Sequence, residues 1–280
     1  MTFQPVIGLG GYSGWLVLQR TEARQREVFE KSPTITRDID YFRENISKAT
    51  SAKALVSDRR LLSVALGAFG LEDEINKKAF VQKILEDGTE SRTAFANRLG
   101  EPRYRAFADA FGYGNIEGGS NVLLEDFRED IIARFKVRAF DRAVGEADSD
   151  ARLALNFRRE ISDLVSDDVT QETKWFRILG QRPLREVVAT ALGIPSESAQ
   201  LDIDKQEQIF SDAAARVFGD SDPAVFQGAD VVDEVLRRFF LIRQAQSGPN
   251  ALTPGSAALT LLQSSALGAG ATQGLFQSQF

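Results

Sequence analysis

Two residue types that carry much of protein chemistry are missing from this chain of 280 residues, which has no cysteine and no histidine. Without cysteine there are no disulfides, no thiolate nucleophiles, and no cysteine-ligated zinc or iron–sulfur sites. Without histidine there is no Ser-His-Asp triad, no imidazole acid or base and no histidine-ligated metal. Carboxylates, lysine, tyrosine and serine alone are left for catalysis. We therefore expect a non-enzymatic protein with no catalytic, cofactor-binding or metal-binding residues.

Charge is missing from both ends of the chain. The first charged residue is Arg20 and the last is Arg243, so all 34 basic and 40 acidic residues lie between these two positions. We expect residues 1–20 to form a flexible N-terminal arm and residues 244–280 to form a low-complexity tail. The apolar run Trp15–Leu18 has no basic residue before it and is far shorter than the roughly 20 residues that span a bilayer. The sequence thus predicts a soluble protein with no secretory signal peptide and no transmembrane segment.

Helical periodicity dominates the charged middle of the chain. Between Leu61 and Phe69 the apolar residues occupy one face of a helix, and Gly70 follows as a stop signal. A longer apolar pattern from Leu123 to Val144 predicts a long helix that ends at Gly145. No alternating run of β-branched residues and no hairpin signal interrupts these patterns. The sequence therefore predicts an all-α fold with eight to ten helices.

Two stretches of the middle resemble each other. The segment 42–46 (FRENI) matches 157–161 (FRREI), and the segment 59–71 matches 182–194 in its apolar stripe, its stop glycine and the aliphatic residue that follows. Because the matches come in the same order, we expect two related, mutually packed helical units, residues 21–145 and 146–243. A chance alignment of amphipathic helices that end in glycine is the alternative.

Three patterns that can indicate ligand sites have simpler explanations here. The run Gly8–Gly11 follows no buried strand and precedes no Lys-Ser or Lys-Thr pair, so it is no phosphate-binding loop. Short acidic runs lack the glycine and closing glutamate of a calcium loop and lie where helices should begin, as capping residues do; they are 148–150, 167–168, 202–204 and 220–222. A further acidic group alternates with arginines on a predicted exposed helix face and comprises Glu125, Asp126, Glu129 and Asp130.

Arginines interleave with aromatic residues in the segments 135–142 and 237–243. A pattern of this kind can bind nucleic acid, but the chain carries a net charge of −6 and its acidic residues are distributed among the basic ones. At helical spacing the phenylalanines face a core, and the arginine stems cover its rim. We therefore expect no nucleic-acid partner.

Several of these motifs together resemble a bacterial family of domains of unknown function whose members are often encoded among flagellar genes. The likeness is strongest over residues 36–114 and extends toward residue 243; the motifs that carry it are 41–46 (YFRENI), 57–66 (SDRRLLSVAL), 68–76 (AFGLEDEIN) and 97–99 (NRL), followed by Arg103, Tyr104 and Phe107. The resemblance implies an all-α, non-enzymatic protein associated with the flagellum, and the localisation we expect is cytoplasmic or flagellum-associated. It transfers no catalytic or ligand-binding residue.

The apolar ends of the chain are the candidate partner-binding segments. Ordering such segments costs entropy that burial against a partner can offset. The residues expected to supply this burial are Trp15, Leu16, Leu18, Leu259 and Leu262.

The leading hypothesis is a structural or protein-interaction factor of the flagellar system, with flagellar proteins as its partners. One alternative is a cytoplasmic regulatory or chaperone-like binding module, which predicts an apolar groove between the two units that takes a partner helix. A second alternative is a carboxylate-based hydrolase, which requires a buried acid in a cleft. The sequence leaves the identity of the partner and homo-oligomerisation open.

Overall fold

The computed structural model describes residues 3–8, 10–99, 101–115, 121–166 and 168–247. Within these ranges the chain forms thirteen α-helices and five short 3-10 helices and no strand, which confirms the all-α fold. There are more helices than the eight to ten expected, because pieces as short as α3 (Ala52–Ser57) and α6 (Phe95–Arg98) contain too few residues to show a helical period.

The first half of the chain contains eight α-helices. In addition to α3 and α6, its elements are α1 (Gly11–Glu30), α2 (Pro33–Asn45), η1 (Ile46–Lys48), α4 (Arg59–Phe69), η2 (Glu72–Asn76), α5 (Lys78–Asp87), α7 (Pro102–Phe111), η3 (Asn121–Leu123) and α8 (Glu125–Ala147). The elements of the second half are α9 (Ser149–Ser166), α10 (Gln171–Leu179), α11 (Arg182–Leu192), η4 (Ser196–Gln200), α12 (Ile203–Phe218), η5 (Pro223–Gln227) and α13 (Ala229–Ser247).

The two halves place similar elements in the same order. Helices α4 and α11 have 11 residues each and end at glycines in the left-handed conformation, Gly70 (φ 69°) and Gly193 (φ 71°). The next amide in each case donates to the carbonyl five residues earlier, at 2.9 Å, which is the Schellman helix stop that the glycines predict. A five-residue 3-10 helix follows in both halves. Helices α6 and α7 have no counterpart in the second half, and a division of the chain near residue 145 stays a prediction.

The core lies along two long helices. Helix α4 packs on α8, and its equivalent α11 packs on α13. The buried apolar residues of both halves belong to one contiguous cluster. Helix α8 runs on to Ala147, two residues past the stop predicted at Gly145. Gly145 is a packing position instead, because a Cβ there would lie 2.4 Å from the Arg152 side chain of α9.

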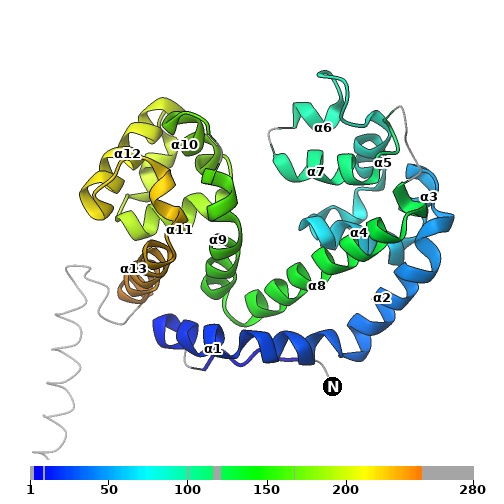
Figure 1. The fold of residues 1–280 in the computed structure, drawn as a ribbon, viewed down its shortest axis with the longest axis horizontal. Helices are drawn as coiled ribbons and strands as arrows, with labels where there is room; N and C mark the ends of the chain where they lie inside the picture. Colours follow the sequence, from blue (N-terminus) through cyan, green and yellow to red (C-terminus); the bar gives the residue numbers. More distant parts are fainter. Residues whose placement is uncertain (1–2, 9, 100, 116–120, 167, 248–280) are drawn as a thin grey trace, which may run out of the picture.

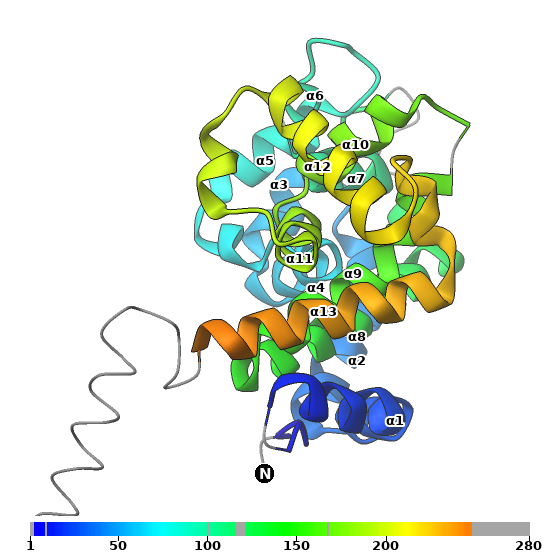
Figure 2. The same cartoon turned by 90° about the vertical axis from the view of Figure 1, so that its left-hand side faces the viewer.

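The corner between α8 and α9 sets the arrangement of the two halves. Asp148 lies between the helices, and its Oδ1 accepts a hydrogen bond of 2.9 Å from the Ala151 amide, so this acid is a helix cap as expected. From the corner the two helices diverge and carry the two halves apart (Figure 1). Helix α1 packs on α2 and α8 in the first half and on α9 and α13 in the second. Figure 2 shows α1 and α13 beside each other at the base.

The expected flexible arm over residues 1–20 is corrected by the structure. Helix α1 begins at Gly11, and within it Trp15 is 2% exposed and Leu18 fully buried. The Trp15 ring stacks on Phe240 of α13 with 5.7 Å between ring centroids. The buried face that starts at Trp15 continues through Gln25 to Phe29, inside the charged region. A lack of charge at this end therefore reflects burial, not the absence of structure.

The segment before α1 is attached to that helix. The Gln25 side chain accepts a hydrogen bond from the Val6 amide at 2.8 Å and donates one to the Val6 carbonyl at 3.0 Å. A Cβ on Gly14 would lie 2.5 Å from the Ile7 carbonyl oxygen, so only glycine admits this approach. None of the helices in the described part of the chain combines the length and apolarity needed to cross a membrane.

Candidate interaction site

The residues predicted to bind a partner are only in part available to one. Trp15 and Leu18 are buried within the chain's own core, and Leu16 is half-buried on the same helix. Leu259 and Leu262 lie outside the described residues. The apolar face of α1 is covered by α13 and its neighbours, so it offers no open surface for a partner.

An open groove lies elsewhere, between the two halves. It has a volume of about 820 Å³, and helices α4, α7 and α8 form one wall and α9 and α10 the other. Its apolar lining consists of Ala68, Phe69, Pro102, Ala106, Ala133, Val137 and Leu164. Its polar lining consists of Arg103, Arg134, Arg138, Arg159, Glu160, Asp163, Arg177 and Gln181. Helix α7, which has no counterpart in the second half, thus supplies part of one wall.

The arginines of the α7–α8 wall make mostly exposed contacts. Arg103 contacts Glu101 and donates to the Gly70 carbonyl. Arg134 pairs with Asp130 at 2.8 Å, and both of these side chains are 52% exposed. The Arg134 guanidinium also lies 5.7 Å from the centre of the Phe69 ring. Exposed ion pairs of this kind contribute about 0–1 kcal/mol to stability, so these arginines can exchange their present acids for other carboxylates.

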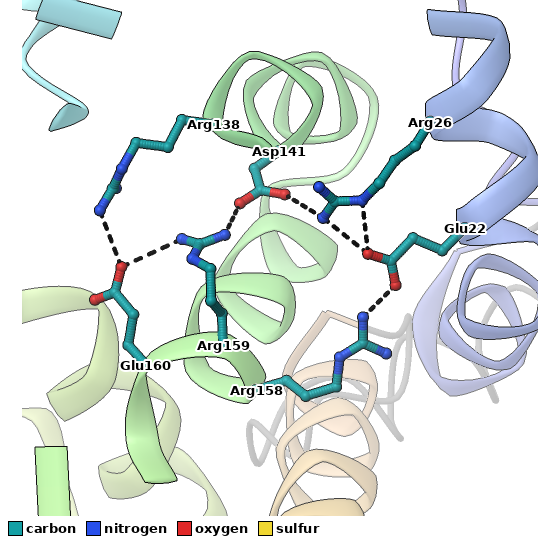
Figure 3. A network of polar contacts seen from close by, with 7 residues as sticks. All are labelled: Glu22, Arg26, Arg138, Asp141, Arg158, Arg159 and Glu160. Atoms are coloured by element: carbon teal, nitrogen blue, oxygen red, sulfur yellow. Dashed lines mark hydrogen bonds and ion pairs between the residues drawn. The ribbon is translucent and has the colours of Figure 1, made fainter. Parts of the chain in front are cut away.

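At the base of the groove, ion pairs join its two walls (Figure 3). Arg138 of α8 reaches Glu160 of α9 at 3.2 Å, and Arg159 contacts the same carboxylate at 3.3 Å. Arg159 also pairs with Asp141, which is 5% exposed on α8. These pairs hold α8 against α9 beyond the corner at Asp148.

The ion pairs continue from the groove to α1. Asp141 accepts from Arg26 at 3.4 Å, and Arg26 pairs with Glu22 at 2.8 Å (Figure 3). Glu22 in turn contacts Arg158 of α9. The Arg26 and Arg158 guanidiniums also lie 4.9 and 5.2 Å from the centres of the Phe140 and Trp15 rings. A connected set of charges therefore links α1, α8 and α9 between the core and the groove.

Two pKa shifts report the balance of charge in this network. Burial raises the pKa of the Asp141 carboxyl above its usual range, and the charges of Arg159 and Arg26 oppose the rise. Burial lowers the pKa of Arg138; Glu160 opposes this, whereas the neighbouring positive charges of Arg159 and Arg103 add to it. The groove end of the network is thus crowded with guanidinium groups.

Sequence reasoning missed this network, although a signal for it was present. In the repeat alignment Arg159 and Glu160 fall on Glu44 and Asn45, so the second copy carries a charge pair that the first lacks. In the arginine–aromatic pattern of α8, the phenylalanines were predicted to face the core and the arginines to cover its rim. Phe135 and Phe140 are indeed buried, but the arginine between them, Arg138, reaches across to α9.

Several of the acidic residues considered for catalysis or for calcium binding lie in structural contacts. Glu129 pairs with Arg43 of α2 at 2.7 Å, and Asp130 with Arg134, on an exposed face of α8. Asp222 caps η5 through the Ala224 amide and contacts Lys174. Asp167 lies outside the described residues. Among the residues that the structure describes, no three acidic side chains are grouped in a way that would hold a metal ion.

Comparisons with known proteins give one family and one fold. A family model described as "Protein of unknown function (DUF1217)" matches residues 68–228, more than half of the chain and the part that contains the whole groove lining. A crystal structure of an Agrobacterium tumefaciens protein from a structural genomics consortium is 26% identical, with a TM-score of 0.67. That match covers 88% of this chain and 98% of the other. A comparison with curated proteins gives no match.

Proposed function

This chain belongs to the DUF1217 family, and from that premise we propose that it is a non-enzymatic, protein-binding scaffold of the bacterial flagellar system. The flagellar part rests on the resemblance of its motifs to a family often encoded among flagellar genes. The protein-binding part rests on one observation, the open groove between the two halves. An apolar lining interspersed with arginines is the composition that protein interfaces favour.

The surroundings of the acids support a scaffold over a carboxylate-based hydrolase. A hydrolase needs an acid held in a cleft with its pKa tuned for proton transfer. Two acids are buried in the described part of the chain, Asp141 and Glu74. Asp141 is engaged by Arg159 and Arg26 between helices, and Glu74 pairs with Lys77 and accepts a hydrogen bond from Tyr104. The groove acid Glu160 is shared by Arg138 and Arg159. These three carboxylates are therefore engaged in structural contacts.

A second candidate, a cytoplasmic regulatory or chaperone-like binding module, is favoured by the same groove. That hypothesis predicts a groove between the two halves that takes a helix from a partner. Cell fractionation separates the candidates. A protein recovered with basal bodies or filaments supports the flagellar scaffold, and one found only in the cytosol supports the binding module.

The experiment for the leading proposal is a clean deletion in the source bacterium. We expect impaired swimming in soft agar, restored when the intact gene is supplied in trans. A tagged chain purified from motile cells should bring flagellar or export components with it. Normal swimming of the deletion strain, together with a pull-down free of such components, would contradict the proposal.

A further inference from the structure

We propose that the groove binds an acidic amphipathic helix of a protein partner, with its apolar face on the apolar lining of the groove and its carboxylates on Arg103, Arg134 and Arg138. This inference rests on the proposed function for the existence of a protein partner. Beyond that function, it specifies that the bound segment is acidic and amphipathic and names the residues that recognise it.

The apolar lining of the groove suits the packing of a helix. It includes two exposed alanines on two helices of one wall, Ala106 of α7 and Ala133 of α8. Small side chains there allow a partner helix to approach closely, while Val137 of the same wall and Leu164 of the opposite wall add apolar contact. An amphipathic helix laid in an apolar groove is a recurrent mode of peptide recognition.

The positive charge of the groove lining favours an acidic ligand. The groove lining contains five arginines against two acids, whereas the whole chain carries a net charge of −6. The arginines nearest to solvent, Arg103 and Arg134, are 46% and 52% exposed, and each pairs with an acid of its own wall. Because exposed pairs contribute only about 0–1 kcal/mol, a partner carboxylate can replace these acids at little cost.

Two guanidinium groups already converge on one point of the wall. A Cβ placed on Gly70 would lie 3.0 Å from Nη1 of Arg138 and 3.2 Å from Nη1 of Arg103. Two like charges this close repel each other, and a carboxylate bound between them relieves the repulsion. Arginine forks also bind carboxylates through two parallel hydrogen bonds, which gives the site geometric selectivity.

The same features favour a protein over a nucleic acid. Nucleic-acid binding requires a continuous basic surface that follows the phosphate backbone. Here the arginines accompany an apolar lining that includes alanine, valine and leucine, on a chain whose net charge is negative. Apolar side chains of a partner helix match that lining, whereas phosphates do not.

Site-specific photo-crosslinking in motile cells tests the ligand. A photoreactive amino acid replaces Ala106 in the groove, and the matched control replaces Ala215, an exposed alanine of α12 outside the groove. We expect adducts at Ala106 alone, and mass spectrometry should place them on an amphipathic segment with a net negative charge. Four results would overturn the inference: adducts on a neutral or basic segment, adducts on a second copy of this chain, nuclease-sensitive adducts, or no excess over the control.

Charge reversal gives a second, independent readout. Arg134→Glu in the groove is compared with Arg237→Glu on α13, since Arg237 is 54% exposed and pairs with Glu234 of its own helix. We expect Arg134→Glu to reduce the Ala106 adducts at least tenfold and Arg237→Glu to leave them unchanged, with unaltered circular dichroism in both. Equal adduct yields in the two variants would contradict the inference.

The two proposals fail in different ways. If the deletion strain swims normally but the acidic adducts form, the flagellar association is wrong and the groove ligand stands. If the deletion strain cannot swim but the groove yields no acidic adduct, the function stands and the groove ligand is wrong.

Discussion

Gly67 is a point in α4 where the absence of a side chain matters to packing. A Cβ there would lie 2.9 Å from the buried ring of Phe135, on α8. The ring is 4% exposed and belongs to the core, so Gly67→Ala should overpack the α4–α8 contact. We expect a loss of about 1–3 kcal/mol in the free energy of unfolding, although alanine itself favours helix. Urea denaturation measures the change.

Gly145→Ala is the matched control, because Gly145 also lies inside a helix. Its added Cβ would lie 2.4 Å from Cδ of Arg152, closer than that of Gly67 to Phe135, but the Arg152 side chain is exposed and can turn to another rotamer. We expect a change within about 1 kcal/mol, with the gain in helix propensity offsetting the adjustment of Arg152. A similar loss in both variants would show that Phe135 does not restrict Gly67.

Asp141 is the buried centre of the ion-pair network. Its side chain is 7% exposed, and removing it leaves Arg159 without the buried partner that it has in α8. We expect Asp141→Ala to cost about 3–5 kcal/mol, the range for breaking a buried pair. The exposed Asp130→Ala, on the same helix, should cost about 0–1 kcal/mol. Equal midpoints in urea would contradict this account of the network.

Tyr104 links the stability of the protein to alkaline pH. Its hydroxyl donates to Glu74 at 3.2 Å, and burial together with the Glu74 charge raises its pKa to about 12. The unfolded chain loses this proton near pH 10 whereas the folded chain keeps it. Its contribution to stability is therefore complete below about pH 10 and is lost as the pH rises through about 12.

We expect Tyr104→Phe to flatten the fall of unfolding free energy with pH in this window. Guanidinium titrations at several alkaline pH values measure the slope for both proteins. Tyr41 and Tyr113, whose pKa values are also raised, leave a residual slope in the variant. An unchanged slope would show that the Tyr104 hydroxyl does not retain its proton.

At the scale of elements, the Gln25 side chain of α1 holds the N-terminal segment at Val6, and Phe3 adds ring contacts with Phe29 of α1 and Phe140 of α8. Gln25 forms two hydrogen bonds to Val6, and net contributions of about 0.5–1.5 kcal/mol each are typical. Gln25→Met keeps the length of the side chain and removes both bonds. We expect amide exchange in residues 3–8 to rise about tenfold, measured by hydrogen–deuterium exchange.

Gln19→Met provides the comparison on the same helix. Gln19 makes one long contact of 3.4 Å, which leads to Asp233 of α13 and not to the segment before α1. Exchange in residues 3–8 should therefore keep its wild-type rate in this variant. Equal acceleration in the two variants would assign the effect to α1 as a whole.

The helices themselves were predictable wherever a complete apolar stripe ends in glycine. This holds for α4 at Gly70 and for α11 at Gly193, since local chemistry decides a Schellman stop. It fails for α8, where Gly145 serves packing against Arg152. The order of α1 depends on Trp15 meeting Phe240, more than 200 positions away, and composition carries no information about such a contact.

The groove was less predictable than the helices. Its walls combine Arg103, Arg138 and Glu160, whose meeting depends on how α8 and α9 diverge at the corner. That angle follows from side-chain packing on both helices and not from any local motif. The sequence did contain one indication of the groove, the charge pair Arg159 and Glu160. These residues depart from the repeat, and packing of a duplicated scaffold does not require a new charge pair in one copy only.

At the scale of the whole molecule, helix α1 bridges the two halves. It packs on helices of both, and its Glu22 and Arg26 complete the ion pairs between α8 and α9 (Figure 3). The groove walls are therefore held at a defined separation at their base. Such a preformed groove limits the entropy that a partner must lose on binding.

Cooperative unfolding follows from this bridge. Tryptophan fluorescence reports on α1 and α10, whereas far-ultraviolet circular dichroism reports on all helices, and we expect one urea midpoint from both. Trp15→Ala removes the stacking on Phe240 and leaves Trp175 as the remaining tryptophan. The cavity should cost about 3–5 kcal/mol and shift both midpoints together, because the destabilised α1 contacts both halves. A biphasic dichroism curve in the wild-type protein, with one phase matching the fluorescence, would instead mean that the halves unfold separately and that α1 does not couple them.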